Sequence, residues 1–176
     1  MIIVRRAGFA DPEHIKNYCD KLSQGEKMYT PETDGINHIN VYSKGKTELG
    51  RLLSNFAHTP FVCDDGRFES VEGYWYWLGN KDDRLRSVYG YNAKSLGRKL
   101  PRQKSLSEEE FKTKIKIAIN KKIKQNNLMN VLAVSRLPFV HYYAWDGHVK
   151  DAGYRWIVDH ITTLRKWLQE HGYPKY

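Results

Sequence analysis

Residues 52–77 read LLSNFAHTPFVCDDGRFESVEGYWYW and contain most of the local signals that decide the fold. Phe61–Cys63 and Arg67–Phe68 flank an Asp-Asp-Gly turn, and Asp-Gly is a favoured turn of a β-hairpin. Ser70 precedes an aromatic-rich run and is a suitable N-cap for a helix. Gly73 weakens that helix by roughly 1 kcal/mol relative to alanine. The stretch therefore predicts a hairpin followed directly by a helix.

The second half of the chain carries the clearest helical patterns. Ser107, with Glu110 three residues later, forms a capping box, and apolar residues then recur at helical spacing up to Ile123. A second periodic run begins after Asp151 and is expected to end at Gly172. Both runs predict amphipathic helices that pack against a common core.

The first half is predicted to hold short strands and loops. Met1–Val4 and Ile39–Tyr42 have strand-like patterns, a helix is expected after Asp11-Pro12, and residues 43–60 are expected to be mostly loop. No segment of residues 1–176 has the composition of a linker. The sequence therefore predicts one compact, helix-rich α+β domain with a small sheet or hairpins in its N-terminal half.

The positive charge of the protein is concentrated in one segment. The chain has 176 residues, 29 Lys+Arg against 20 Asp+Glu and a formal net charge of +9. Between Lys94 and Lys124 there are 11 basic and 3 acidic residues, so this segment carries +8. We expect a basic loop at Lys94–Lys104 to face a phosphate-bearing ligand. The helix lysines are interpreted as solvated, with Glu108–Lys112 and Glu110–Lys114 as i,i+4 pairs.

Composition also excludes several classes of protein. The longest apolar runs are only a few residues, so no membrane span is expected. The N-terminus lacks the pattern of a secretory signal. Cys19 and Cys63 match no metal or disulfide framework, which indicates reduced thiols in an intracellular, cytoplasmic protein. No cofactor or metal is expected, and the sequence leaves the oligomeric state open.

Glu72 is the carboxylate most suited to acid–base chemistry. It lies between Val71 and an aromatic run, so burial is expected to raise its pKa. Composition alone favours a structural carboxylate that caps a helix or pairs with an arginine. The aromatic run at residues 74–77 is too long for every ring to face inward on one helix. We expect one or two of these rings to be exposed in a cleft, with Trp75 or Trp77 available for stacking.

Three elements of the chain resemble the NADAR superfamily, the YbiA-like proteins. The LSNF of residues 53–56 leads to the SVE of residues 70–72. Residues 92–98, NAKSLGR, resemble the family's AK.LGR element, and residues 122–128, KIKQNNL, resemble its KF.QN..L element. The elements occur in the family's order, and the resemblance is strongest between residues 40 and 130.

This resemblance implies a compact α+β fold and cleavage of the bond between a ribose C1 and a nitrogen. It places the catalytic role on Glu72, the glutamate of SVE. The resemblance and the residue chemistry together give the candidate substrate-binding residues: Ser54, Asn55, Phe56, Trp75, Trp77, Lys94, Arg98, Lys99, Trp145 and Asp146.

The chain also departs from the family pattern. Gly73 occupies a position where the family usually has histidine, and the family's later D..WG element has no counterpart in the same frame. Residues 141–146 form a polar–aromatic cluster that could replace this element. For His141, the preceding apolar run favours a structural histidine over a site residue.

Three functions follow as hypotheses. The first is an N-glycosidase that removes ADP-ribose from ADP-ribosylated guanine in nucleic acid. The second is an N-glycosidase that acts on a riboflavin-pathway intermediate, a small phosphorylated riboside. The third is a module that binds ADP-ribose or nucleic acid without turnover. Only the first two require an acidic side chain at Glu72.

Overall fold

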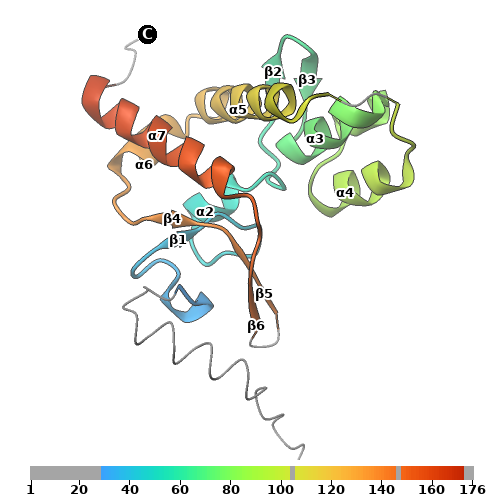
Figure 1. Cartoon of the computed structure of the whole chain (residues 1–176). Coiled ribbons are helices and arrows are strands. Elements are labelled where there is room, and N and C mark those ends of the chain that lie inside the picture. The colour runs from blue at the N-terminus through green and yellow to red at the C-terminus, as the bar shows by residue number, and fades with distance from the viewer. Residues whose placement is uncertain (1–28, 104–105, 146–147, 173–176) are drawn as a thin grey trace, which may run out of the picture.

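The computed structural model describes residues 29–103, 106–145 and 148–172 (Figure 1). Among these residues helices predominate, and the strands are short. The elements are η1 Pro31–Thr33, β1 Ile39–Asn40, α2 Glu48–Leu53, β2 Phe61–Cys63, β3 Gly66–Phe68, α3 Val71–Asn80, η2 Asp83–Ser87, α4 Gly90–Lys99, α5 Glu108–Gln125, α6 Met129–Val134, β4 Phe139–Val140, β5 Tyr142–Trp145, β6 His148–Asp151 and α7 Arg155–His171.

The hairpin and helix predicted from residues 52–77 are confirmed. Strands β2 and β3 are antiparallel, with Phe61 opposite Phe68, and the turn ends at Gly66, whose φ of 108° is available to glycine. Ser70 caps α3 by accepting a hydrogen bond of 3.0 Å from the backbone N–H of Gly73. The local signals are sufficient here because the interacting residues of the hairpin and of the helix cap lie within a few positions of each other in the sequence.

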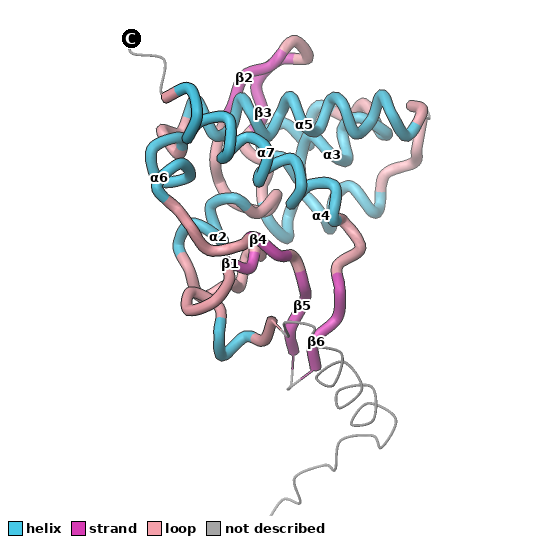
Figure 2. The backbone as a smooth tube through the Cα atoms, turned by 60° about the vertical axis from the view of Figure 1, so that its left-hand side comes forward, coloured by secondary structure: helices cyan, strands magenta, loops and turns pink. Residues whose placement is uncertain are grey.

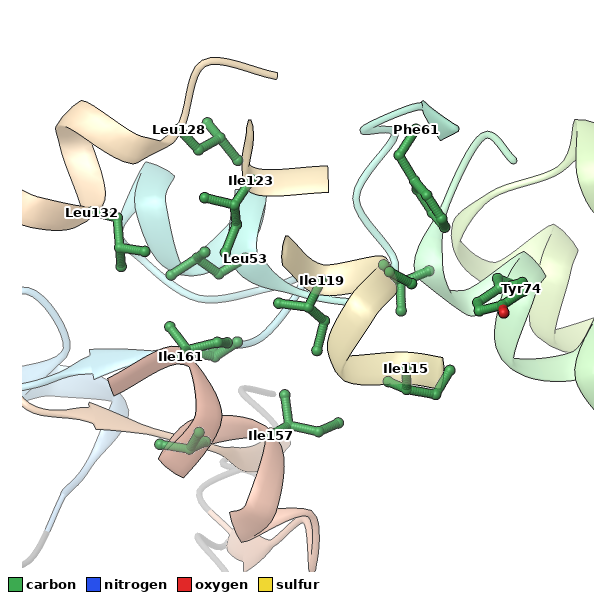
Figure 3. Close-up of a cluster of buried hydrophobic side chains, with 14 of the residues drawn as sticks. Leu53, Phe61, Tyr74, Ile115, Ile119, Ile123, Leu128, Leu132, Ile157 and Ile161 are labelled. Carbon is green, nitrogen blue, oxygen red and sulfur yellow. The ribbon is translucent and has the colours of Figure 1, made fainter. Parts of the chain in front are cut away.

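Helix α5 forms the centre of the hydrophobic core. The predicted capping box is present, with the Ser107 side chain accepting from the Glu110 N–H and the Glu110 side chain accepting from the Ser107 N–H. Figure 3 shows the inward face of α5 between the hairpin and α3 on one side and α6 and α7 on the other. The labelled core residues are Leu53, Phe61, Tyr74, Ile115, Ile119, Ile123, Leu128, Leu132, Ile157 and Ile161.

The remaining strands depend on long-range pairing. Strand β1 is parallel to β4, and Ile39 and Phe139 are register partners 100 residues apart. Strands β5 and β6 form a second antiparallel hairpin, which extends away from the helical body in Figures 1 and 2. In addition to the short strands expected in the N-terminal half, β4, β5 and β6 lie in the C-terminal half.

Residues 43–60 are mostly loop, as predicted, but they also contain helix α2, whose N-cap Thr47 side chain accepts from the Gly50 N–H. Lys94–Lys99, the first part of the expected basic loop, belongs to α4. The predicted strand at residues 1–4 and the predicted helix after Asp11 lie outside the described residues. The observed architecture is nevertheless the expected helix-rich α+β fold.

Within the described part of the chain, no helix has both the length and the apolar character needed to span a bilayer. The helices that are present are amphipathic or short, and they pack on the common core.

We predict that Gly73→Ala destabilises the protein by about 1–3 kcal/mol. A Cβ atom at Gly73 would lie 2.4 Å from the backbone carbonyl oxygen of Leu85, so η2 must move to accommodate it. The matched control is Gly79→Ala in the same helix, where the nearest atoms are 4.0 Å away. The control should be neutral or stabilising by up to about 1 kcal/mol in urea unfolding. Equal stabilities of the two variants would contradict the close approach.

Candidate active site

A cavity of about 770 Å³ lies between α3, α4 and the β5–β6 hairpin, beside the loop that follows α2. Its volume is typical of sites for small molecules and nucleotides. Most of the residues predicted from the sequence line this one cavity: Ser54, Asn55, Phe56, Glu72, Trp75, Lys94, Arg98 and Trp145.

Among the described residues that line the cavity, Glu72 is the only acidic one. It lies in the first turn of α3 with 9% of its surface exposed. Burial raises the pKa of its carboxyl to about 7, and the positive charges of Lys94 and Arg98 act in the opposite direction. The environment therefore holds a carboxyl group that changes charge near neutral pH.

The loop at residues 54–56 is held against α3 and α5. The backbone N–H of Glu72 donates to the carbonyl oxygen of Asn55 at 2.9 Å. From the other side, Lys122 Nζ donates to the carbonyl oxygen of Ser54 at 2.7 Å. Lys122 is 1% exposed, and burial lowers its pKa to about 7. It is not the solvated lysine that the helix pattern predicted. The predicted Glu108–Lys112 ion pair is confirmed, whereas Lys114, predicted to pair with Glu110, forms an ion pair of 2.9 Å with Asp65.

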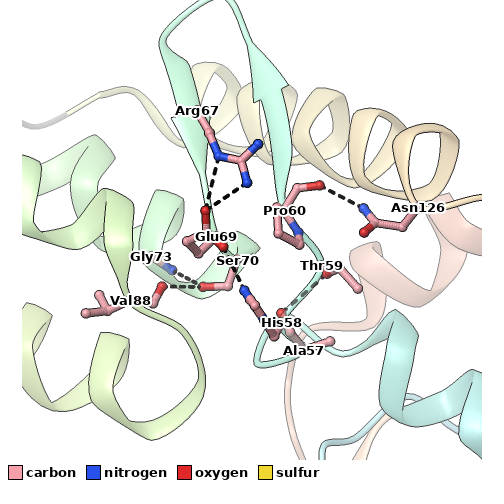
Figure 4. A network of polar contacts seen from close by, with 10 residues as sticks. All are labelled: Ala57, His58, Thr59, Pro60, Arg67, Glu69, Ser70, Gly73, Val88 and Asn126. Atoms are coloured by element: carbon pink, nitrogen blue, oxygen red, sulfur yellow. Dashed lines mark hydrogen bonds and ion pairs between the residues drawn. The ribbon is translucent and has the colours of Figure 1, made fainter.

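Residues 122–128, the third element that resembles the NADAR pattern, anchor strand β2, which follows this loop. The Asn126 side chain donates to the carbonyl oxygen of Pro60 at 2.8 Å, as Figure 4 shows. The Gln125 side chain exchanges two hydrogen bonds with the backbone of Val62, at 2.7 and 3.0 Å. Side chains at the end of α5 thus hold the backbone at Ser54, Pro60 and Val62, which are far from them in sequence.

The start of α3 is tied to its neighbours by side-chain bonds drawn in Figure 4. Ser70 Oγ donates to the carbonyl oxygen of Val88 at 3.0 Å, which connects the Glu72 turn to the approach to α4. Glu69 accepts from Arg67 and lies 2.7 Å from His58 Nε2. These contacts join the hairpin, His58 and the approach to α4 to residues 69 and 70, directly before the α3 turn that holds Glu72.

Helix α4 presents two cations to the cavity. Lys94 and Arg98 are four residues apart on one face of α4, and both line the cavity. Helix α4 packs closely on α3 because residue 97 is a glycine. A Cβ atom at this position would lie only 2.1 Å from the Tyr76 ring. Lys99 is exposed and does not line the cavity, since it is rotated by about 100° from Arg98. The predicted ligand contact of Lys99 does not fit its position.

The aromatic run of α3 divides between cavity and core. Trp75 lines the cavity and forms edge contacts with Phe111 and Tyr154, at centroid distances of 4.6 and 5.5 Å. Trp77 faces the other side, is 8% exposed and donates from Nε1 to Asp83 at 3.2 Å. The alternative stacking role for Trp77 does not fit this position, whereas Trp75 remains suited to it.

The β5–β6 hairpin supplies a wall of the cavity that includes part of the polar–aromatic cluster noted at residues 141–146. Tyr143 and Lys150 line the cavity, and Trp145 lies at its edge with 51% of its surface exposed. His141 also lines it, and its Nδ1 atom is buried without a hydrogen-bond partner among the described residues. Burial lowers the pKa of His141. The predicted site residue Asp146 lies outside the described residues.

No group of three or more His, Cys, Asp or Glu side chains in the described ranges could hold a metal ion. Cys63 donates weakly to the carbonyl oxygen of Gly66 at 3.6 Å, and burial raises the pKa of its thiol. The described side chains that could do chemistry at the cavity include a carboxyl group, the His141 imidazole, cations and aromatic rings. Cys19 lies outside the described residues.

Comparisons with protein-family models and with curated proteins found no match to this sequence. Among solved structures, the chain is similar to the NMR structure of the E. coli protein YbiA, with a TM-score of 0.53 and 20% sequence identity. The similarity covers 84% of this chain and 99% of YbiA. At this level of identity the likeness shows the fold, and the YbiA-like α+β fold expected from the sequence is confirmed.

We predict that Glu72→Gln stabilises the protein above pH 7. The folded-state pKa of Glu72 is about 7 against a reference of 4.5, so the stability of the unmodified protein falls as pH rises through this window. The variant lacks this loss and should be more stable at pH 8 by up to about 3 kcal/mol, with the difference vanishing near pH 4. Urea unfolding measures it, and exposed Glu109→Gln should show no such pH dependence. A pH-independent difference for Glu72→Gln would be incompatible with the raised pKa.

We predict that Lys122→Met loosens the loop at residues 54–56. Methionine keeps the buried stem but removes the donor to Ser54, and hydrogen bonds from charged groups contribute about 1.5–3 kcal/mol. The backbone amide of Glu72 should then exchange with deuterium about tenfold faster or more. Exposed Lys121→Met is the matched control and should leave this amide unchanged. Unaltered exchange in Lys122→Met would remove its role in holding the loop.

Proposed function

We propose that this protein is an N-glycosidase that removes ADP-ribose from ADP-ribosylated guanine in nucleic acid. The observation that carries the proposal is Glu72, a buried carboxyl group with a pKa near 7 in a nucleotide-sized cavity, flanked by Lys94 and Arg98. The resemblance of residues 53–56, 70–72, 92–98 and 122–128 to the NADAR superfamily and the fold shared with YbiA support the same reaction class.

The chemistry needs one well-placed carboxylate. As the C1–N bond breaks, positive charge develops on the ribose ring in an oxocarbenium-like transition state. Ionised Glu72 stabilises that charge or takes a proton from the attacking water, whose oxygen forms the new bond to C1. The departing nitrogen receives a proton, so the products are the free ribose hydroxyl and the free amine. The partly buried site strengthens this electrostatic effect.

The other cavity residues fit binding roles. Lys94 and Arg98 form no ion pair with any described residue, so both are available to phosphate oxygens. The Trp75 ring lines the cavity and is held by edge contacts with Phe111 and Tyr154 and by the nearly parallel Trp156 ring at 6.2 Å, which suits it to contact the base of the substrate. These residues orient the substrate, and the loop at residues 54–56 brings its polar groups to the same space as Glu72.

The departure at Gly73 has a packing explanation that leaves the proposal intact. The position faces the Leu85 carbonyl rather than open space, so a side chain has no room there. Glu72 is the preceding residue and lines the cavity. The absence of a histidine at residue 73 therefore reflects the close contact between α3 and η2.

We predict that Glu72→Gln lowers release of ADP-ribose from a guanine-ADP-ribosylated oligonucleotide by about 100-fold or more. The rate of the unmodified protein should rise with pH through about 7 and level off above it, because the active form is the ionised carboxylate. Glu109→Gln, an exposed carboxylate on α5, should retain full activity. Chromatography of the released ADP-ribose provides the measurement.

Equal release by the Glu72→Gln variant and the unmodified protein would remove Glu72 from the mechanism. Turnover of a ribosylated amino-pyrimidine without release from the oligonucleotide would select the riboflavin-pathway substrate instead. Tight binding of ADP-ribose with no turnover of either substrate would make the protein a binding module.

A further inference from the structure

Exposed aromatic rings gather at the mouth of the cavity. Among the described residues, the aromatic side chains classed as exposed are Tyr89, Tyr91, Trp145, Tyr154 and Trp167. Tyr91, Trp145 and Tyr154 line the cavity. The exposed large aliphatic residues lie elsewhere, and none of them lines it: Ile36, Val62, Ile117, Val131 and Val134.

Two of these rings lie on different walls of the cavity, one on α4 and one on β5. Tyr91 is in the first turn of α4 with 73% of its surface exposed. Trp145 ends β5 with 51% exposed, and its nearest ring is His148 at a centroid distance of 6.1 Å. Beside Tyr91, the Tyr89 ring is stacked on His58 at 4.4 Å. The mouth therefore offers ring faces at two separate places.

Unpaired cations accompany the rings on both walls. Lys94 and Arg98 lie on the α4 side, and Lys44 and Lys150 line the side formed by β6 and the segment after β1. Within the described ranges none of these four forms an ion pair. An anionic chain that crosses the mouth would meet positive charge on each side of Glu72.

We propose that the mouth of this cavity binds single-stranded nucleic acid, with unpaired bases stacked on Tyr91 and Trp145 on either side of the nucleotide that enters the cavity. The inference rests on the proposed function and names the form of its partner. Exposed rings interleaved with cations are the usual surface for single strands, because every unpaired base presents a stacking face. In a duplex those faces are covered by neighbouring bases, so the rings would gain nothing.

The test measures binding of unmodified, fluorescein-labelled 12-mers by anisotropy, with single-stranded DNA, single-stranded RNA and duplex DNA of one sequence. We expect at least one single strand to bind tighter than the duplex. Tyr91→Ala and Trp145→Ala should each weaken that binding by about tenfold, the scale of one lost stacking contact. Trp145→Phe keeps a ring and should retain most of the affinity. Trp167→Ala removes an exposed ring on α7 and is the matched control, expected to leave affinity unchanged.

Equal or tighter binding of the duplex would overturn the proposal, as would equal losses in Trp167→Ala and Tyr91→Ala. Because the oligonucleotides are unmodified, these outcomes are independent of hydrolysis. Loss of activity in Glu72→Gln together with ring-independent binding would keep the glycosidase and reject the single-strand surface. Ring-dependent binding together with full activity in Glu72→Gln would keep the single-strand surface and reject the role of Glu72 in the glycosidase reaction.

Discussion

The geometry of the cavity depends on one buried hydrogen bond, from Lys122 Nζ to the carbonyl oxygen of Ser54. Placing an ammonium group in the interior has a high desolvation cost, which is why burial lowers its pKa to about 7. The bond fixes the carbonyl that precedes Asn55, and the next carbonyl accepts the backbone N–H of Glu72. The core helix α5 is thereby connected to the carboxyl group of the site through two hydrogen bonds.

Close helix packing sets the electrostatics around that carboxyl group. The ring of Tyr76 occupies the space where a side chain at residue 97 would lie, so α3 and α4 approach closely. This brings Lys94 and Arg98 near Glu72, and their charges oppose the effect of burial on its pKa. A bulkier residue at position 97 would separate the helices. The pKa near 7 results from burial that is only partly compensated.

Local signals predicted the elements that close within a few residues. Ser70 and Ser107 were read correctly as N-caps because their partners lie three residues away. Strand β1 is only two residues long and is completed by β4, so no local pattern could reveal the pairing. Helix α2 was not predicted because its six residues, which include Gly50, are too few for a periodic pattern. Resemblance to a family identified Glu72, since composition alone favoured a structural carboxylate.

The sequence by itself determined which chemistry is present: a glutamate at the start of a capped helix, a run of aromatic rings and a basic segment. Only the tertiary structure decided which members face the cavity. Trp75 faces it and Trp77 does not, because successive helical residues differ in direction by about 100° and neighbouring elements fix the phase. The same holds for Arg98 against Lys99. The β5–β6 wall joins the site through contacts with residues far away in sequence, and such contacts leave no local pattern.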